Sequence, residues 1–402
     1  MLTLCLVIVA GIALSLLLLA HGVVGWLSVQ RHNNRHCSIP VSVLKPLKGA
    51  DDDLEANLES FCRQTHGQYE ILLGVADASD PALPIARKIA ANHPEIPIRV
   101  IVGECPSGLN PKVRLLRALV RNARHDTLLI SDSNVQVDEF YLSATASELE
   151  DPAVGLVSNP IIGHGDGTLG SALESLQLNS YVIYGLALAN FIGKHACVVG
   201  KSMLLRRRAL AQIGGLAKFA DILAEDYLIG RAISRSGWRV VTCPSAIKTI
   251  NKTWTLNKLW QRHLRWSQIR RNLGTGGYLL ELLLLPHVWL LSAAVSATVN
   301  GVPSPLGSSH ALLSLCAVAY AFACLSEIAA IARWSRQPAL DAKLVLFVAV
   351  RQFGQLLLWS IAWSKCEVDW RGHKLRIGKG SRLTDPRLAP QQSRPSLARQ
   401  TA

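Results

Sequence analysis

The alternation of apolar and polar positions divides this chain into three parts. Residues 2–20 carry no charge, and the apolar run extends to Trp26. This is long enough to cross a bilayer, which takes about 20 apolar residues. From Pro40 to about Val240, short apolar runs alternate with amphipathic stretches, and beyond Trp254 long apolar segments return. The pattern predicts a folded middle domain with membrane segments on both sides.

The middle part is typical of an α/β domain with a mostly parallel sheet. Leu54, Leu58 and Phe61 are spaced to form one apolar face of a helix. The predicted strands are 41–44, 70–76, 98–102 and 126–131, and the predicted helices are 53–64, 84–92 and 112–122. Because ligands of open α/β sheets bind beyond the carboxyl ends of the strands, we expect the functional site there.

The first apolar segment is interpreted as a transmembrane helix over residues 1–27. It lacks the basic start of a cleaved signal peptide, the alternative, and its apolar run is longer than such peptides use. Arg31, His32, Arg35 and His36 follow directly. By the positive-inside rule they place the amino terminus outside and the domain of residues 38–275 in the cytoplasm.

Three apolar segments follow the domain within residues 278–364, at 278–299, 310–332 and 342–363. Residues 300–309 are uncharged, which suits the outside, whereas the second linker carries Arg333 and Arg336 and should be cytoplasmic. The tail, 365–402, has nine Lys/Arg against three acids and should also be cytoplasmic. Its last twenty or so residues have the composition of a disordered segment.

Three complete spans would leave this tail outside, so one segment is expected not to cross. The candidate is 342–363, as a re-entrant or interfacial helix, because Arg351, Gln352 and Gln355 would be costly facing lipid. The alternative is a true span whose polar face lies inside the bundle.

The composition disfavours several classes of protein. Nine scattered cysteines without a CxxC pair indicate neither a disulfide framework nor a zinc site, and suit a reducing compartment. The net charge is +14 in 402 residues, and the basic residues adjoin apolar segments. This favours anionic lipid headgroups over nucleic acid, for which no motif appears.

Carboxylates follow two of the predicted strands. Asp77 and Asp80 come after the second strand, where they can bind a base or ribose, or simply form a turn. Asp132 follows an apolar strand, with Asp138 six residues later. A carboxylate there suits Mg²⁺ or Mn²⁺ on a diphosphate, although Asn134 replaces the second acid of an Asp-X-Asp pair.

Further charged groups lie in the second half of the domain. Glu225 and Asp226 begin a predicted helix, where an Asp can act as general base or simply favour the helix dipole. Lys201 and Arg206–Arg208 form one basic group, and residues 251–276 carry six Lys/Arg and no acid. We expect the latter to form an amphipathic helix in the headgroup plane, its arginines serving as lipid anchors or as diphosphate ligands.

Together these residues resemble the D, D, D, (Q/R)XXRW series of membrane-anchored inverting glycosyltransferases. The series consists of Asp77, Asp132, Asp226 and Gln261-X-X-Arg265-Trp266. Over residues 40–270 the chain resembles the ceramide glucosyltransferase family in particular. The blocks concerned are PVSVLKPLKG (40–49), DASDPA (77–82), GLNPKV (108–113), ISDSNVQV (130–137), CVVGKSMLLRR (197–207), GGLAKFADILAEDY (214–227) and QRHLRW (261–266).

The resemblance implies a GT-A-type domain that transfers a sugar from a UDP-sugar to a membrane lipid hydroxyl with inversion, most simply glucose to ceramide. It also implies the residue roles. Asp77 and Asp80 would contact the uridine, Asn110 and Lys112 would line the nucleotide pocket, Asp132 would hold the metal, Asp226 would be the base, and Gln261, Arg265 and Trp266 would engage the diphosphate and close the acceptor site. Residues 170–192, a second apolar stretch, are assigned to the acceptor.

Three alternatives remain. A bacterial relative would use another lipid, either a hopanoid polyol with UDP-N-acetylglucosamine or diacylglycerol. A processive polysaccharide synthase shares the four motifs but should carry more membrane spans. A non-enzymatic membrane adaptor is disfavoured because Asp77, Asp132, Asp226 and Arg265 are all present. The sequence alone determines neither the sugar nor the oligomeric state.

Overall fold

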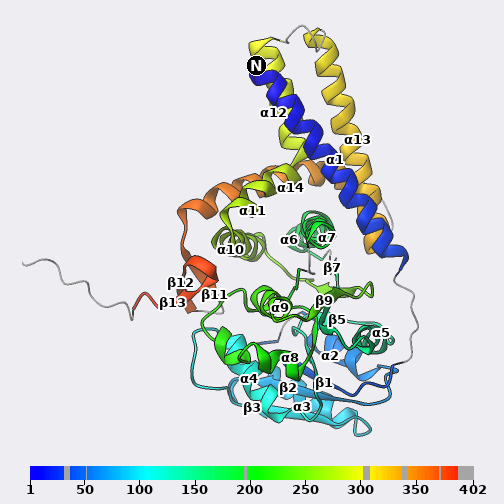
Figure 1. The fold of residues 1–402 in the computed structure, drawn as a ribbon, viewed down its shortest axis with the longest axis vertical. Helices are drawn as coiled ribbons and strands as arrows, with labels where there is room; N and C mark the ends of the chain where they lie inside the picture. Colours follow the sequence, from blue (N-terminus) through cyan, green and yellow to red (C-terminus); the bar gives the residue numbers. More distant parts are fainter. Residues whose placement is uncertain are drawn as a thin grey trace, which may run out of the picture.

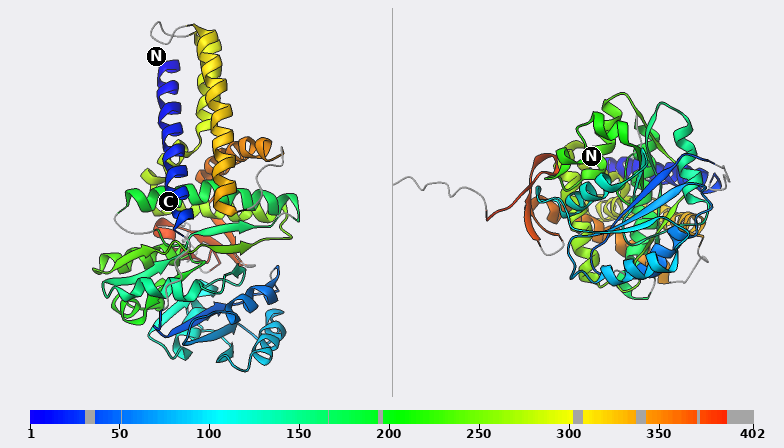
Figure 2. Two further views of the ribbon diagram at one scale, coloured as in Figure 1. Left: turned by 90° about the vertical axis from the view of Figure 1, so that its right-hand side faces the viewer. Right: turned by 90° about the horizontal axis from the view of Figure 1, so that it is seen from below.

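The computed structural model describes residues 1–30, 37–50, 52–165, 167–193, 197–301, 308–336, 343–370 and 373–387. The basic residues 31–36 used for orientation, and most of the segment expected to be disordered, lie outside the described residues. The described chain forms an α/β domain from which a bundle of long helices projects (Figures 1 and 2).

The domain is built on a seven-stranded sheet in the order β3-β2-β1-β4-β8-β6-β9. Its strands are β1 (Val41–Pro46), β2 (Tyr69–Val75), β3 (Ile98–Val102), β4 (Thr127–Ile130), β6 (Val154–Ser158), β8 (Met203–Arg206) and β9 (Arg239–Thr242). β1 to β4 are mutually parallel and β8 runs antiparallel to both neighbours. The predicted α/β class and the four predicted strands are confirmed.

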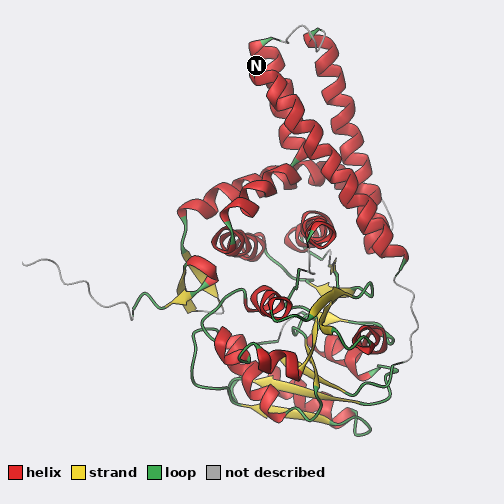
Figure 3. Ribbon diagram, in the orientation of Figure 1, coloured by secondary structure: helices red, strands yellow, loops and turns green. Residues whose placement is uncertain are grey.

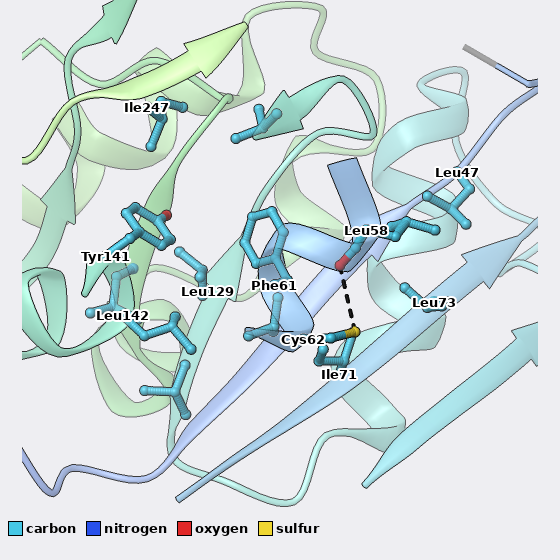
Figure 4. Close-up of a cluster of buried hydrophobic side chains, with 14 of the residues drawn as sticks. Leu47, Leu58, Phe61, Cys62, Ile71, Leu73, Leu129, Tyr141, Leu142 and Ile247 are labelled. Carbon is cyan, nitrogen blue, oxygen red and sulfur yellow. Dashed lines mark hydrogen bonds between the residues drawn. The ribbon is translucent and has the colours of Figure 1, made fainter. Parts of the chain in front are cut away.

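Side chains alternate between the two faces of this sheet, and each face is covered by helices. Val43 of β1 packs in the core with α2 (Leu54–Cys62), α3 (Ala82–Asn92) and α5 (Tyr141–Ser147), as Figure 4 shows for Phe61 and Tyr141. Leu44, the next residue, packs on the opposite side with α4 (Pro111–Asn122), α8 (Arg207–Gln212) and α9 (Glu225–Arg235). Side chains alternate between the faces, and both faces are buried, so most positions of a strand are apolar and the strands appear as continuous apolar runs in the sequence.

A second, three-stranded sheet links the domain to the helices above it. It consists of β5 (Val135–Gln136), β10 (Ile247–Ile250) and β7 (Ile161–His164), in that order. Above it lie α6 (Leu169–Gln177), a π-helical turn (Leu178–Val182), α7 (Ile183–Ile192) and α10 (Leu256–Leu273). This layer separates the main sheet from the projecting bundle.

The projecting bundle contains α1 (Leu2–Val29), α12 (Pro286–Asn300) and α13 (Ser309–Ser335). Leu2–Val29, Ser309–Ser335 and Leu346–Ser364 are long and apolar enough to cross a membrane. The predicted apolar segment 278–299 is bent in the structure. Thr275–Leu284, containing α11 (Thr275–Leu280), meets α12 at a bend of 70° before Pro286.

The last long helix, α14 (Lys343–Ser364), lies across the foot of this bundle instead of along it (Figures 1 and 3). Its polar side chains point into the protein. Arg351 Nη2 donates to Glu327 Oε1 on α13 at 2.5 Å, and Gln355 Oε1 accepts from Gln177 Nε2 on α6 at 2.8 Å. The expected cost of these groups facing lipid therefore does not arise.

The tail returns to the α/β domain. It forms β11 (Glu367–Trp370), β12 (His373–Ile377) and β13 (Leu383–Thr384), a small antiparallel sheet. Arg382 pairs with Ile222 in an antiparallel bridge just before α9. The basic tail is therefore structured up to Arg387 and contacts the loop that leads into the Glu225–Asp226 pair.

Candidate active site

A cluster of charged side chains lies at the carboxyl ends of β1 and β4. Asp132, directly after β4, is held by two lysines. Lys112 Nζ lies 2.8 Å from its Oδ1, and Lys201 Nζ lies 3.1 Å from its Oδ2. Lys45, at the end of β1, donates to the main-chain oxygen of Asp132 at 2.6 Å. The site is where strand geometry predicts it, and it is strongly cationic around one carboxylate.

Asn110 fixes the position of Lys112. It is the N-cap of α4, and its side-chain oxygen accepts from Val113 N at 3.0 Å, with Pro111 in the first turn. The amide nitrogen of Asn110 donates to Ile222 O at 2.6 Å and reaches Glu225 Oε2 at 3.3 Å. One capping residue thus ties the lysine helix to the loop that carries the acids.

Glu225 and Asp226 complete the cluster at the start of α9. Lys112 Nζ lies 3.2 Å from Glu225 Oε1. The Gly200 N–H donates to Asp226 Oδ2 at 2.6 Å, and Tyr227 N donates to Oδ1 at 2.8 Å. A Cβ at Gly200 would lie 2.9 Å from both Asp226 Oδ2 and Lys112 Nζ, so any other residue here would displace the two charged groups.

Burial and mutual charge shift the pKa values within the cluster. Burial alone would raise the pKa of Asp132, but Lys112 and Lys201 together hold it well below its usual range. Burial lowers the pKa of Lys201 to about 8, despite Asp132. Burial also raises the pKa of Glu225 to about 7 and the pKa of Asp226 in the same direction. The site therefore keeps Asp132 ionised and raises the pKa values of its other two acids.

Asp77 and Asp80 lie at the same edge of the sheet, after β2, and have no described contact with this cluster. Asp80 is buried, and its Oδ1 accepts from Gly49 N at 2.8 Å and Ala82 N at 2.9 Å. Asp77 is exposed and accepts from Ser79 N at 2.9 Å. Asp80 thus holds two loops together, while Asp77 remains open to a ligand.

The Gln261-X-X-Arg265-Trp266 motif lies on α10. Gln261 is exposed and Arg265 is partly buried, while Trp266 packs against the main core. The residue after Gln261 matters more for packing than the motif suggests. Arg262 stacks over Trp266 at 4.6 Å and pairs with the fully buried Glu174 of α6 at 2.9 Å.

The interpretation of the basic residues as lipid anchors is wrong for most of them. Arg206 and Arg207 donate to main-chain carbonyls within the domain, including Val154 O at 2.8 Å and Ala123 O at 2.8 Å. On α10, Arg262 pairs with Glu174, and Arg270 pairs with Glu281 at 2.7 Å. Planar guanidinium groups suit such multiple contacts inside a protein.

The donor set for a metal is small. Within the described residues, no group of three or more His, Cys, Asp or Glu side chains is arranged to hold a metal ion. Asn134 Oδ1 accepts from Lys201 at 2.5 Å, and the exposed Asp138 accepts from Phe140 N at 3.1 Å. Among the described residues of the charged cluster, Asp132 is the candidate ligand at the end of β4, and Mg²⁺ commonly takes one or two carboxylates plus phosphate oxygens.

Three residues of the site escaped the sequence analysis. The sequence gives Lys45 and Glu174 no role, and it shows Lys201 only as a member of a basic group with Arg206–Arg208. Lys45 carries a usable signal, because a lysine in a buried strand must find a partner. Glu174 carries a weaker one, as the one acid between residues 167 and 193 in an apolar stretch.

Sequence comparisons cover nearly the whole chain. The model of glycosyl transferase family 21 matches residues 3–383. Ceramide glucosyltransferase 1 of Caenorhabditis elegans is 26% identical over 305 residues, which are 74% of this chain and 63% of that protein. Ceramide glucosyltransferase of Komagataella phaffii is 26% identical, over 60% of this chain and 58% of that protein. The chain spans less than two thirds of the length of these relatives.

Solved structures are more distant. Mannosyltransferase PcManGT from Pyrobaculum calidifontis, in complex with GDP-Man and Mn²⁺, has a TM-score of 0.44 and 17% identity, over 89% of this chain and 99% of that one. At this level of similarity it adds nothing to the assignment, which rests on the family match. The chain belongs to glycosyl transferase family 21.

Proposed function

We propose that this protein is an inverting glycosyltransferase that moves glucose from UDP-glucose to ceramide at a membrane surface. One observation carries the proposal. Three carboxylates and three lysines converge at the strand ends, in the layer below the helical bundle. This is the charge pattern needed to hold a nucleoside diphosphate and to remove a proton beside it.

The lysines act on the donor. Breaking the sugar–phosphate bond leaves a diphosphate with added negative charge, and Lys112 and Lys201 stabilise that charge as it develops. Both are nearly fully buried, with side-chain exposures of 9% and 10%. Their charges therefore act in a medium of low dielectric constant, where they are worth more than in water. Asp77, exposed at the neighbouring strand end, contacts the uridine in this proposal.

Asp132 is the proposed ligand of Mg²⁺ or Mn²⁺. When bound, such an ion neutralises charge on the diphosphate oxygens. Asp132 suits this role because its pKa is held well below its usual range, so that it stays ionised at any working pH. The two lysines that now bracket Asp132 would share the diphosphate with the cation.

Asp226 is the proposed general base. A single displacement with inversion needs one base to take the acceptor proton and no enzyme nucleophile. Asp226 is partly exposed and oriented by the Gly200 and Tyr227 N–H groups, whereas its neighbour Glu225 is buried against Lys112. The exposed member of the pair is therefore the one that can meet the acceptor hydroxyl.

The acceptor reaches the site from the bundle side. α7 packs directly against α1 through Ile183 and Ala187, so this layer joins the site to the long helices. We assign acceptor contact to residues 170–192 and to the α10 motif, Gln261, Arg265 and Trp266. The names of the curated relatives favour ceramide over a hopanoid polyol or diacylglycerol.

We also propose that the domain faces the cytoplasm. The described basic residues support this, because Arg333 and Arg336 end α13 on the domain side. A cytoplasmic face also has access to UDP-sugars and keeps the nine cysteines reduced.

The test is a matrix of reactions. Detergent-solubilised protein is incubated with UDP-glucose, UDP-galactose or UDP-N-acetylglucosamine, each against ceramide, diacylglycerol and a hopanoid polyol, with and without EDTA. Lipid products are identified by mass spectrometry. We expect hexosylceramide from UDP-glucose and loss of product in EDTA. Product from another pair alone would assign a different donor or acceptor, and no product from any pair would refute the proposal.

The variants Asp226→Asn and Asp132→Asn separate the two roles. Asp226→Asn should retain UDP binding and lose transfer, because it removes the base but not the lysines. Asp132→Asn should weaken metal-dependent UDP binding. Normal binding and transfer in both variants would contradict the assigned roles.

A further inference from the structure

The C-terminal tail contacts residues 220–224, the loop that precedes the Glu225–Asp226 pair. Leu223 N donates to Ser381 O at 2.9 Å, and Ala224 N donates to the Ser381 hydroxyl at 2.8 Å. Leu383 N donates to Asp221 O at 2.7 Å. The tail thus adds a short antiparallel pairing to this loop, although about 160 residues separate them in sequence.

The opposite side of the same loop is tied to the start of α4. Asn110 N donates to Ala220 O at 2.8 Å, and the Asn110 side chain donates to Ile222 O at 2.6 Å. Leu109 N donates to Asp221 Oδ1 at 2.9 Å. The loop is therefore held between the lysine helix and the tail, and its next residue is Glu225.

Apolar packing reinforces the pairing. Leu223, only 5% exposed, packs in a separate cluster with four residues of the tail. These residues are Val368, Leu375, Ile377 and Leu383. The cluster consists almost wholly of the tail and this loop, so its main contribution is to fix one against the other.

Ser381 is the centre of this contact. It is fully buried and has φ of 61°, a left-handed conformation that a serine adopts at a cost. That conformation directs both its carbonyl and its hydroxyl at successive N–H groups of the loop. A strained, buried residue is retained where the surrounding structure gains from its geometry.

We propose that residues 367–370 and 373–384 form a clasp that fixes loop 220–224, and that Ser381 is a positioning residue for the Glu225–Asp226 pair. This rests on the proposed function. The clasp acts through the main chain. With the loop released, Asp226 loses its place relative to Gly200 and to the acceptor, while Lys112, held by its own cap, keeps the donor.

The test compares Ser381→Ala with Ser143→Ala in the full-length protein. Ser143 is equally suited to the change, because it is buried on α5 and its hydroxyl contacts His66 Nδ1 at 3.1 Å. We expect Ser381→Ala to lower kcat roughly tenfold, since a displacement of about 1 Å can cost up to ~10²-fold. The KM for UDP-glucose should stay within about twofold, and Ser143→Ala should keep the wild-type kcat.

Hydrogen exchange supplies a readout that does not depend on activity. In Ser381→Ala the Ala224 amide, which loses its acceptor, should exchange at least about tenfold faster. The Leu223 amide keeps its main-chain acceptor, Ser381 O, so its exchange should accelerate less than that of Ala224. An unchanged Ala224 rate, or a kcat equal to that of Ser143→Ala, would overturn the clasp. A wild-type protein that makes no glycolipid would instead refute the proposed function, and the exchange rates would still decide whether the clasp exists.

Discussion

Replacing Gly200 by alanine tests the geometry of the charged cluster with one methyl group. The added Cβ would lie 2.9 Å from Asp226 Oδ2, 2.9 Å from Lys112 Nζ and 3.3 Å from Asp226 Cβ. Ordinary van der Waals contact begins at 3.4 Å, so both charged groups must move by about 0.5 Å. Lys112 can move at its flexible end, but Asp226 is in contact through its Cβ as well and has to turn away.

The expected loss follows from that displacement. A misplacement of about 1 Å costs up to ~10²-fold in rate, so about half of it should lower kcat roughly tenfold. This corresponds to about 1.4 kcal/mol of transition-state stabilisation. Overpacking should also reduce the free energy of unfolding by about 1 kcal/mol, partly offset because alanine restricts the unfolded chain.

The assay is steady-state glucosylceramide formation, with kcat and the KM for UDP-glucose measured separately, beside thermal unfolding in detergent. Gly67→Ala is the matched control, because a Cβ there meets no atom within 4 Å. If Gly200→Ala keeps kcat within about twofold of wild type, Asp226 does not act from the position described here.

Three other measurements probe charge in the site and in the bundle. The kcat should fall as the pH drops, because burial raises the pKa of Asp226, the proposed base, and raises the pKa of its neighbour Glu225 to about 7, and protonation removes the base; a flat profile from about pH 5 to 8 contradicts this. Glu174→Gln should lower the free energy of unfolding by about 3 kcal/mol, since it leaves the buried Arg262 of α10 without its carboxylate partner, and urea titration showing a loss below about 1 kcal/mol refutes the pairing. Glu327→Gln should lower the thermal midpoint in detergent, because it leaves the buried Arg351 without its carboxylate partner. The double variant Glu327→Gln/Arg351→Met should recover most of the loss, and no recovery would contradict the importance of the ion pair.

The local part of the site was accessible from sequence, because strand ends obey a simple rule. Asp132 and Asp77 follow apolar runs, and parallel strands bring their carboxyl ends to one edge. Lys45 follows the same rule, because a lysine at the end of a buried apolar run must have a polar partner nearby. The residues that the sequence could not assign are those whose partners are distant, such as Glu174 with Arg262 on another helix.

In the membrane part, too, the sequence did not reveal the bend within 278–299 or the partner of Arg351 on another helix. Hydropathy measures the length of an apolar segment and not its direction, so 278–299 was predicted to be one span although the chain turns by 70° within it. Pro286, at the start of α12, is the signal for a new helix there. Arg351 would be costly facing lipid, but its partner Glu327 lies on a different helix, so a pattern within one segment does not reveal the pair.

The charges of the second linker and of the tail place both on the domain side, whereas three complete spans after the domain would leave the tail on the other side. The arrangement of the long helices bears on this conflict. Thr3 Oγ1 donates to Gly301 O at 3.1 Å, so the amino terminus and the end of α12 lie together, far from the domain. α13 returns to it, because Trp334 Nε1 donates to Ile161 O at 3.2 Å. The tail is on the domain side as well, through Ser381. α1, α12 and α13 run along the projecting bundle and α14 lies across its foot, so Arg333, Arg336 and the tail lie on the domain side (Figure 1). We propose that this side is cytoplasmic, where the positive-inside rule places both basic segments.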